Sequence, residues 1–175
     1  MGWATAVEGE SEIGIQQIRD GLMAWQSTGT GMRRPYFLAL LADALLHDSQ
    51  ITEALKTVEE AEALIEQSSE TRWLAETIRL KGVLMDRAGA EVKDIERTYQ
   101  YAMEIASGQD ARWLQIRVAI SLGRYWNNNG KESEAYNLLN PLYVWFTEGF
   151  ETPDLKDAKL LLDAMSAVST GCVKT

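Results

Sequence analysis

Residues 82–89 read GVLMDRAG, and this stretch of eight residues has counterparts at three other places in the chain. Each counterpart begins with a small residue and ends, seven positions later, with a residue typical of turns: Gly2 and Gly9, Ala42 and Ser49, Gly82 and Gly89, and Gly123 and Gly130. Successive pairs lie 40, 40 and 41 residues apart. A fixed period of this size indicates a repeat protein, in which each unit buries its apolar side against its neighbours.

Apolar residues on both sides of these turns follow the spacing of helices, and strand-like alternation is weak. Ile15, Ile18, Leu22 and Trp25 form one stripe on a helix expected over residues 11–27. Pro35 is favourable in the first turn of a helix expected to end near Asp48. The same reasoning predicts a loop over residues 27–34 and helices over residues 51–68, 71–88, 91–107, 111–128, 131–147 and 153–168.

Small residues recur in the second helix of three of the four predicted pairs, where two helices would approach closely. Five positions after the turn residue stand Gly14, Ala54, Asp94 and Ala135. This pattern resembles the tetratricopeptide repeat (TPR), although that unit has about 34 residues and this one is longer. HEAT-like repeats match the longer period but do not predict the step of seven residues. We therefore expect an all-α, right-handed superhelix of antiparallel helix hairpins, with about four units and a C-terminal capping helix.

The domain boundaries follow from the repeats. Residues 1–169 are expected to form a single TPR-like domain, and residues 170–175 a flexible tail. The first repeat is truncated, because residues 1–8 leave room for only a short first helix. Since the stripe on residues 11–27 is then poorly covered, we expect self-association, for example as a homodimer, through this N-terminal unit.

The composition excludes several classes of partner. A net charge of -9 disfavours nucleic acid and anionic membranes, which attract clustered Lys and Arg. No apolar run approaches the length of about 20 residues that spans a bilayer, and the N-terminus does not resemble a signal peptide. The single cysteine, Cys172, suits a reducing compartment. A cytoplasmic location is expected.

Nothing in the sequence predicts an enzyme, a metal site or a cofactor. The lone histidine, His47, is expected to cap the end of a helix as a solvated side chain. Gly130-Lys131 lacks the other residues of a phosphate-binding loop. The six tryptophans favour packing within and between repeats, and a ligand cage made of them is the alternative.

One set of residues predicts a binding surface. In a superhelix of this type the first helix of each pair lines the concave groove. The groove-facing positions stand six and three residues before the small residue, and one and four after it; we call them the inner positions. They hold Tyr36, Ala39, Asp43 and Leu46 in the second hairpin, Glu76, Arg79, Val83 and Asp86 in the third hairpin, and Arg117, Ile120, Arg124 and Asn127 in the fourth hairpin.

The three arginines and the asparagine predict a groove that binds a protein or peptide with an acidic or carboxylate-bearing segment. The alternative is that Arg79, Arg117 and Arg124 pair with Glu76, Asp86 and neighbouring acids. If the groove binds, replacing Arg79 and Arg124 together by Glu should abolish binding without lowering the melting temperature.

Two longer stretches carry a closer resemblance. They are residues 2–22 continued by residues 34–42, and residues 138–155, which include the run Trp145-Phe146-Thr147-Glu148-Gly149-Phe150. Both resemble the C-terminal repeat region of bacterial regulators in which an adenylate/guanylate cyclase or transcriptional effector is joined to a predicted AAA-type ATPase. The resemblance implies a non-enzymatic sensor or scaffold arm for signalling through protein–protein interaction. The alternative is a sensor that binds a small metabolite or signal molecule in the concave groove.

Overall fold

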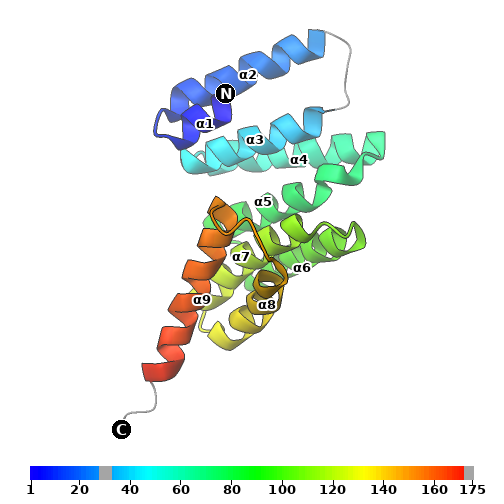
Figure 1. The fold of residues 1–175 in the computed structure, drawn as a ribbon. Helices are drawn as coiled ribbons and strands as arrows, with labels where there is room; N and C mark the ends of the chain where they lie inside the picture. Colours follow the sequence, from blue (N-terminus) through cyan, green and yellow to red (C-terminus); the bar gives the residue numbers. More distant parts are fainter. Residues whose placement is uncertain (28–32, 172–175) are drawn as a thin grey trace. The chain divides into compact units, whose positions relative to one another are not determined.

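A computed structural model describes residues 1–27 and 33–171, and within these ranges the chain is helical with no strand (Figure 1). The helices are α1 (Gly2–Val7), α2 (Ser11–Ser27), α3 (Arg34–His47), α4 (Ile51–Ser68), the single 3-10 turn η1 (Thr71–Trp73), α5 (Leu74–Arg87), α6 (Val92–Gly108), α7 (Arg112–Asn128), α8 (Glu132–Trp145) and α9 (Pro153–Gly171). The predicted helices are therefore confirmed, with boundaries that differ by up to three residues. Most of the loop expected over residues 27–34 lies outside the described residues.

The predicted turn residues all adopt the left-handed backbone conformation that ends a helix. Their φ angles are 108° at Gly9, 60° at Ser49, 73° at Gly89 and 73° at Gly130. The same two hydrogen bonds close each turn: at Gly89, for example, its own N–H donates to the Asp86 carbonyl and the next N–H donates to the Met85 carbonyl. These bonds satisfy the last carbonyls of the first helix and reverse the chain.

The small residues allow the two helices of a hairpin to approach closely. A Cβ built on Gly14 would lie 2.5 Å from the carbonyl oxygen of Gly2, so α1 and α2 touch through their backbones. In the third hairpin the expected small position holds Asp94, which is exposed. There the ring of Tyr99, from α6, fills the notch above Gly82 of α5. In this hairpin a large residue of the second helix packs on the small residue of the first.

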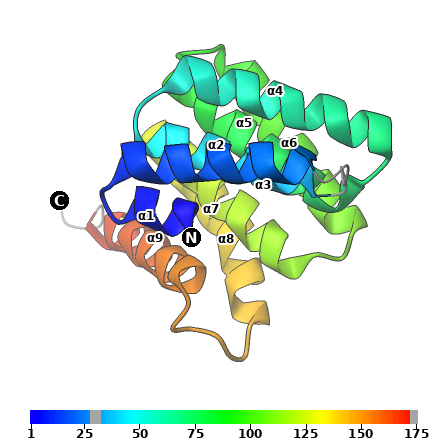
Figure 2. The same cartoon turned by 90° about the horizontal axis from the view of Figure 1, so that it is seen from above.

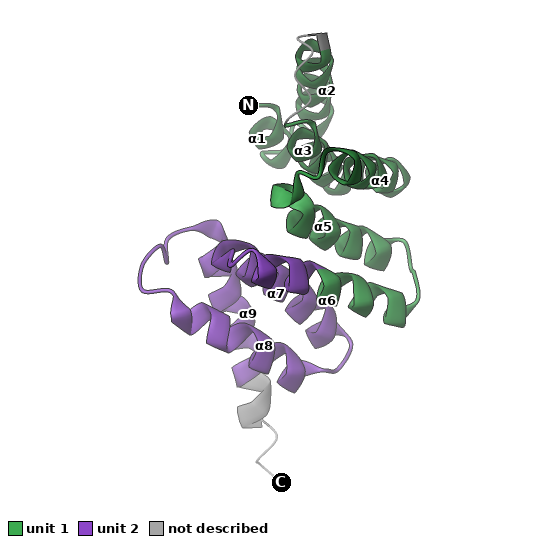
Figure 3. Ribbon diagram, turned by 90° about the vertical axis from the view of Figure 1, so that its right-hand side faces the viewer, with its two compact units in different colours: residues 1–101 green, residues 102–175 purple. Residues whose placement is uncertain are grey.

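The chain divides into two compact units, residues 1–101 and residues 102–175, which are described separately (Figure 3). In the first unit, α2 packs on α1 and α3, α4 packs on α3 and α5, and the buried core comes mainly from α3 and α4. In the second unit, α9 packs on both α7 and α8. Its buried residues join Ile116, Ala119, Ala135 and Leu139 in the core.

The first helix of the first hairpin is short. Helix α1 has 6 residues, whereas α3 and α5 have 14 each and α7 has 17. It lies against only one part of α2 (Figures 1 and 2). Ile15 and Ile18 of the predicted stripe are buried, while Leu22 and Trp25 are only half-buried. At the other end, α9 continues to Gly171, two residues past the boundary expected at 169.

Candidate functional site

The inner positions of α5 in the first unit hold a buried ion pair. Arg79 donates from Nε to Glu76 Oε2 at 2.9 Å and from Nη2 to Glu76 Oε1 at 2.7 Å, a two-pronged contact one turn apart on the helix. The side chains are only 10% and 15% exposed. Burial disfavours the charged form of Arg79, but the Glu76 carboxylate, with Asp43 and Tyr99, outweighs it and raises the pKa of Arg79 above its ordinary value.

This geometry gives Arg79 a structural role. Its guanidinium is turned to Glu76 within the protein, and breaking such a pair leaves a poorly solvated charge behind. Arg79 is therefore unsuited to the double replacement by Glu considered above, because that change would place two carboxylates side by side in a buried position and lower the melting temperature.

Asp43, at an inner position of α3, accepts a hydrogen bond from Nε1 of Trp3 at 2.7 Å. His47 Nε2 lies 4.0 Å from the same carboxylate oxygen, Oδ2. Trp3 stands one residue after Gly2, as Asp43 stands one residue after Ala42. The counting rule that found Asp43 therefore finds Trp3 as well, once it is applied to the short first hairpin.

Tyr36, another inner residue of α3, belongs to an aromatic cluster. Its ring centroid lies 4.3 Å from that of Trp73 in η1, with 35° between the ring planes, and 5.4 Å from that of Phe37. The other two inner residues of α5 are Val83, which is half-buried, and Asp86, which is exposed. On α3, Ala39 is buried and Leu46 is half-buried. Trp73 was not among the predicted site residues, because the inner positions of its hairpin begin at Glu76.

In the second unit, the inner arginines of α7 pair with carboxylates of α9. Arg117 Nη1 lies 3.8 Å from Asp154 Oδ2, and Arg124 Nη2 contacts Asp157 Oδ1. The Arg124 side chain is 51% exposed and that of Arg117 34% exposed. Asn127, one turn beyond Arg124, is half-buried. Pairs this open to solvent contribute about 0–1 kcal/mol each.

All three predicted arginines thus have acidic partners, as the alternative interpretation expected, but the partners differ in kind. Arg79 is buried with Glu76 in the first unit, whereas Arg117 and Arg124 are accessible in the second. Asp154 and Asp157 were not among the acids expected. The groove as a binding site stays a prediction.

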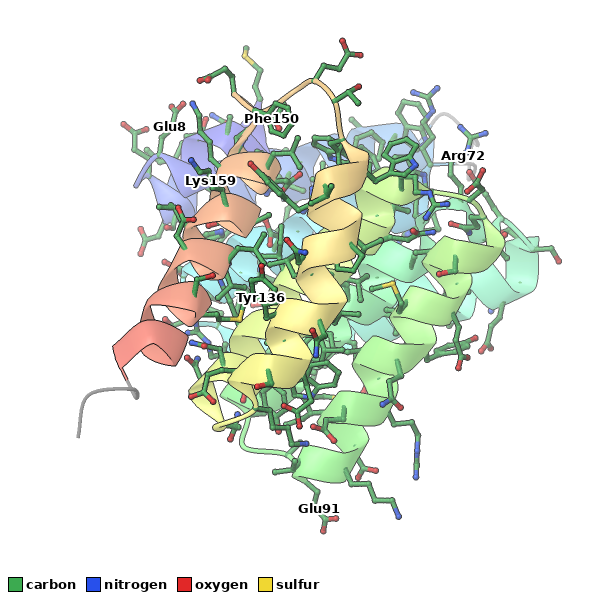
Figure 4. The ribbon with its side chains drawn as sticks, turned by 60° about the horizontal axis from the view of Figure 1, so that its bottom comes forward. Glu8, Arg72, Glu91, Tyr136, Phe150 and Lys159 are labelled. Carbon is green, nitrogen blue, oxygen red and sulfur yellow. The ribbon has the colours of Figure 1, made fainter. Side chains whose placement is uncertain are left out.

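Aromatic residues gather at the end of α8, where the chain has its most distinctive run. The ring of Trp113 lies 5.3 Å from that of Phe146, and the Arg112 guanidinium lies 5.5 Å from the ring centre of Trp145. Trp145 is exposed, as is Phe150, which is labelled in Figure 4. The run therefore packs partly against α7 and partly faces solvent.

His47 and the possible metal ligands among the described residues were also compared with the predictions. His47 is exposed in the last turn of α3, where a solvated cap was expected. Within residues 1–27 and 33–171 no three His, Cys, Asp or Glu side chains gather as metal ligands would. None of the described helices is both long enough and apolar enough to cross a bilayer.

Comparison with known proteins gives the fold a name. No family model matches the chain. It is 30% identical over 121 residues to an uncharacterized protein of Rhizobium meliloti (strain 1021), covering 69% of this chain but only 12% of that protein. Among solved structures, it resembles TPR-like repeats assigned to a kinesin light chain of Podosopora anserina, with a TM-score of 0.64 and 16% identity over 99% of this chain and 94% of that one.

A variant of the same repeats gives a TM-score of 0.68, again with 16% identity, over 98% of this chain and 84% of that one. The chain has a TPR-like repeat fold. This confirms the expected hairpin repeats, despite a period longer than about 34 residues. A likeness at this level of identity extends to the fold alone.

Proposed function

We propose that this chain is a non-enzymatic module that binds a protein or peptide carrying an acidic segment. The observation that carries the proposal is the row of accessible cationic and polar side chains on α7: Arg117, Arg124 and Asn127. The TPR-like fold supports it, because the first helices of such hairpins present their side chains to a partner.

The spacing of the two arginines suggests the form of the partner. Arg117 and Arg124 are seven residues apart, which is about 10.5 Å along a helix. A peptide in the polyproline II conformation has three residues per turn and advances about 3.1 Å per residue, so carboxylates three residues apart lie on one face and about 9 Å from each other. Such a segment can present one carboxylate to each guanidinium. Its two-pronged contacts would replace the solvated contacts with Asp154 and Asp157, which cost little to exchange.

Inner residues of the first unit would form a contact surface of their own. Tyr36 offers an aromatic face, and Asp43, with Trp3, offers a carboxylate that is already hydrogen-bonded. Val83 and Asp86 complete the set of inner residues. We assign Arg79 and Glu76 to positioning, because their side chains are nearly buried against each other.

The wider context belongs to the same proposal. The sequence resemblance of residues 138–155 favours a sensor or scaffold arm of a cytoplasmic bacterial regulator that contains an ATPase or cyclase. The bacterial relative fits this, since the chain matches about an eighth of its length. Self-association through the truncated first hairpin stays part of the proposal, and sedimentation that shows only monomers at high concentration would contradict it.

A peptide titration tests the binding proposal. The probes are two labelled peptides of equal length, one with Asp three residues apart in a neutral background and one with Asn in those places. We expect the acidic peptide alone to bind, more weakly as salt rises. Arg117→Gln together with Arg124→Gln should abolish binding.

The matched control is Arg97→Gln, which removes an exposed arginine that is paired with Asp94 on α6. It should leave the affinity unchanged. Acidic-peptide binding that survives in the double variant, or that Arg97→Gln weakens equally, would show that the site on α7 is not the one used.

A further inference from the structure

The turn between α7 and α8 holds an asparagine directly before its glycine. Asn129 and Gly130 occupy the places that other residues take in the other three hairpins: Glu8 and Gly9, Asp48 and Ser49, and Ala88 and Gly89. Both residues of the fourth turn are exposed, and a Cβ built on Gly130 would meet no described atom within 4 Å. Water therefore reaches a side-chain amide that the other three turns lack.

An asparagine followed by a glycine loses its amide without an enzyme. The backbone nitrogen of Gly130 gives its proton to hydroxide and attacks Cγ of Asn129, so that a new Cγ–N bond forms. The Cγ–Nδ2 bond breaks, and Nδ2 takes up a proton from water and leaves as ammonia. A five-membered succinimide ring remains. Glycine favours this step because it has no Cβ to hinder the approach.

Water then opens the ring in one of two ways. Cleavage of the new Cγ–N bond gives aspartate. Cleavage of the bond between the backbone carbonyl carbon of Asn129 and the same nitrogen gives isoaspartate, whose main chain runs through Cγ. The net reaction consumes water and releases ammonia, and it needs no other reactant. We propose that Asn129 is a site of spontaneous deamidation and that opening of the α7–α8 turn sets its rate.

The closed turn holds the reacting atoms apart. Asn129 Nδ2 donates to the Tyr125 carbonyl at 2.7 Å, which draws the side chain back along α7. The N–H of Gly130 points the same way, toward the Asn127 carbonyl at 3.4 Å. The ψ angle that follows the C-cap geometry of Asn129 is 21°, so the Gly130 nitrogen lies near the backbone nitrogen of Asn129, whereas the ring needs it on the side of Cβ. The turn must therefore open before the attack.

Little opposes that opening. The N–H of Lys131 donates to the Trp126 carbonyl at 2.9 Å and closes the turn together with the longer bond from Gly130. These bonds lie at an exposed end of a helix, where local opening costs much less free energy than unfolding of the whole chain. The reaction in the folded protein is thus slower than in an unfolded chain, but it is not abolished.

The other asparagines of the chain are poorer sites. Asn127 and Asn128 are each followed by an asparagine, whose Cβ hinders the attack. Asn137 lies within α8 and is followed by a leucine. Asn140 precedes Pro141, which has no N–H to ionise. Deamidation should therefore be confined to Asn129.

Both products weaken the turn. A carboxylate cannot donate to the Tyr125 carbonyl, and it places a negative charge at the end of α7, where the helix dipole is also negative. Isoaspartate lengthens the main chain by one carbon atom between Cα of residue 129 and Gly130. Deamidation should therefore loosen the α7–α8 hairpin, which contributes Ala135 and Leu139 to the core of the second unit.

Tryptic mapping of the aged protein tests the proposal. The full chain is incubated at neutral pH, folded in buffer or unfolded in guanidinium chloride, and a sample taken at the start corrects for changes during digestion. Cleavage after Arg124 and Lys131 releases residues 125–131, and fragmentation in the mass spectrometer locates each change from amide to acid. We expect it at Asn129, as aspartate and isoaspartate, at least about tenfold slower in the folded chain.

Variants separate the chemistry from the fold. In guanidinium chloride, where folding is irrelevant, Gly130→Ala should slow the reaction at least about tenfold, because its Cβ hinders the attack. Asn129→Asp imitates one product and should lower the urea midpoint of the folded protein. Asn128→Asp is the matched control, since Asn128 is exposed and the added charge is the same. It should lower the midpoint less, because the hydrogen bond to Tyr125 remains.

Other outcomes would overturn the proposal. Equal rates in the folded and unfolded chains would mean that the turn does not set the rate. A folded chain without acid at Asn129, after the unfolded chain has converted fully, would mean that the native protein is not modified there. Equally fast change at Asn127 or Asn128 would mean that glycine does not direct the attack. Arg117 and Arg124 take no part in this reaction, so this proposal and that of peptide binding can fail separately.

Discussion

Gly82 shows how tightly single residues are constrained in the first unit. A Cβ at this position would lie 2.7 Å from Cε1 of Tyr99 and 2.9 Å from Cδ1 and Cζ. The ring is almost completely buried and cannot move aside freely. We expect Gly82→Ala to lower the free energy of unfolding by about 1–3 kcal/mol, measured by urea denaturation.

Gly21 in α2 is the matched control for that change. A Cβ there would meet nothing within 4 Å. Gly21→Ala should therefore stabilise the protein by about 0.5–1 kcal/mol, through helix propensity alone. Equal effects of the two substitutions would show that Tyr99 does not fill the notch at Gly82.

The buried pair of Arg79 and Glu76 makes a second prediction at this scale. Arg79→Met should cost about 3–5 kcal/mol, because Glu76 loses its two-pronged partner in a poorly solvated place. Arg79→Lys should cost less, since it keeps the charge but not the planar fork. Thermal and urea unfolding measure both variants.

Arg97→Met tests whether burial is the cause. The Arg97–Asp94 pair has the same spacing on a helix but is 69% and 50% exposed, so its loss should cost less than about 1 kcal/mol. If Arg79→Met is as mild as Arg97→Met, then Arg79 is not structural and the assignment of its role is wrong.

At the scale of the element, α9 depends on its apolar face more than on its ion pairs. Leu155 is fully buried, and Leu155→Ala should cost about 2–5 kcal/mol. Asp154→Ala and Asp157→Ala together remove both contacts with α7 but should cost at most about 2 kcal/mol, because those pairs are solvated. Urea unfolding followed by circular dichroism measures the free energy of unfolding of both variants. A larger loss in the double aspartate variant than in Leu155→Ala would mean that the ion pairs stabilise α9 more than its apolar face does.

The whole molecule should unfold unevenly, because each hairpin of a repeat protein packs only on its neighbours. Leu155→Ala should therefore speed amide exchange in α7, α8 and α9 and leave α3 and α4 as protected as before. Hydrogen exchange with mass spectrometry measures this helix by helix. Equal loss of protection in both units would show that the chain unfolds as one cooperative body.

The array was largely predictable because its signal is local. A residue in the left-handed conformation ends a helix through backbone hydrogen bonds that span at most five residues. Because these bonds are local, the glycines at positions 9, 89 and 130 were enough to predict the turns. Ser49 takes the same conformation although it is not a glycine.

The candidate site was less predictable, because its side chains depend on burial and on partners distant in sequence. The inner positions hold Arg79, Arg117 and Arg124, yet the surroundings of these three side chains differ completely. Arg124 meets Asp157, 33 residues away, because α9 packs on α7. No spacing within α7 contains that information.

The amino-acid sequence by itself determined the hairpins, their period and the short first helix, since turns, caps and apolar stripes act over a few residues. Only the tertiary structure decided that Arg79 is buried against Glu76 and that Tyr99 packs on Gly82. Solvation and packing decide those features, because they depend on which helices meet across the array.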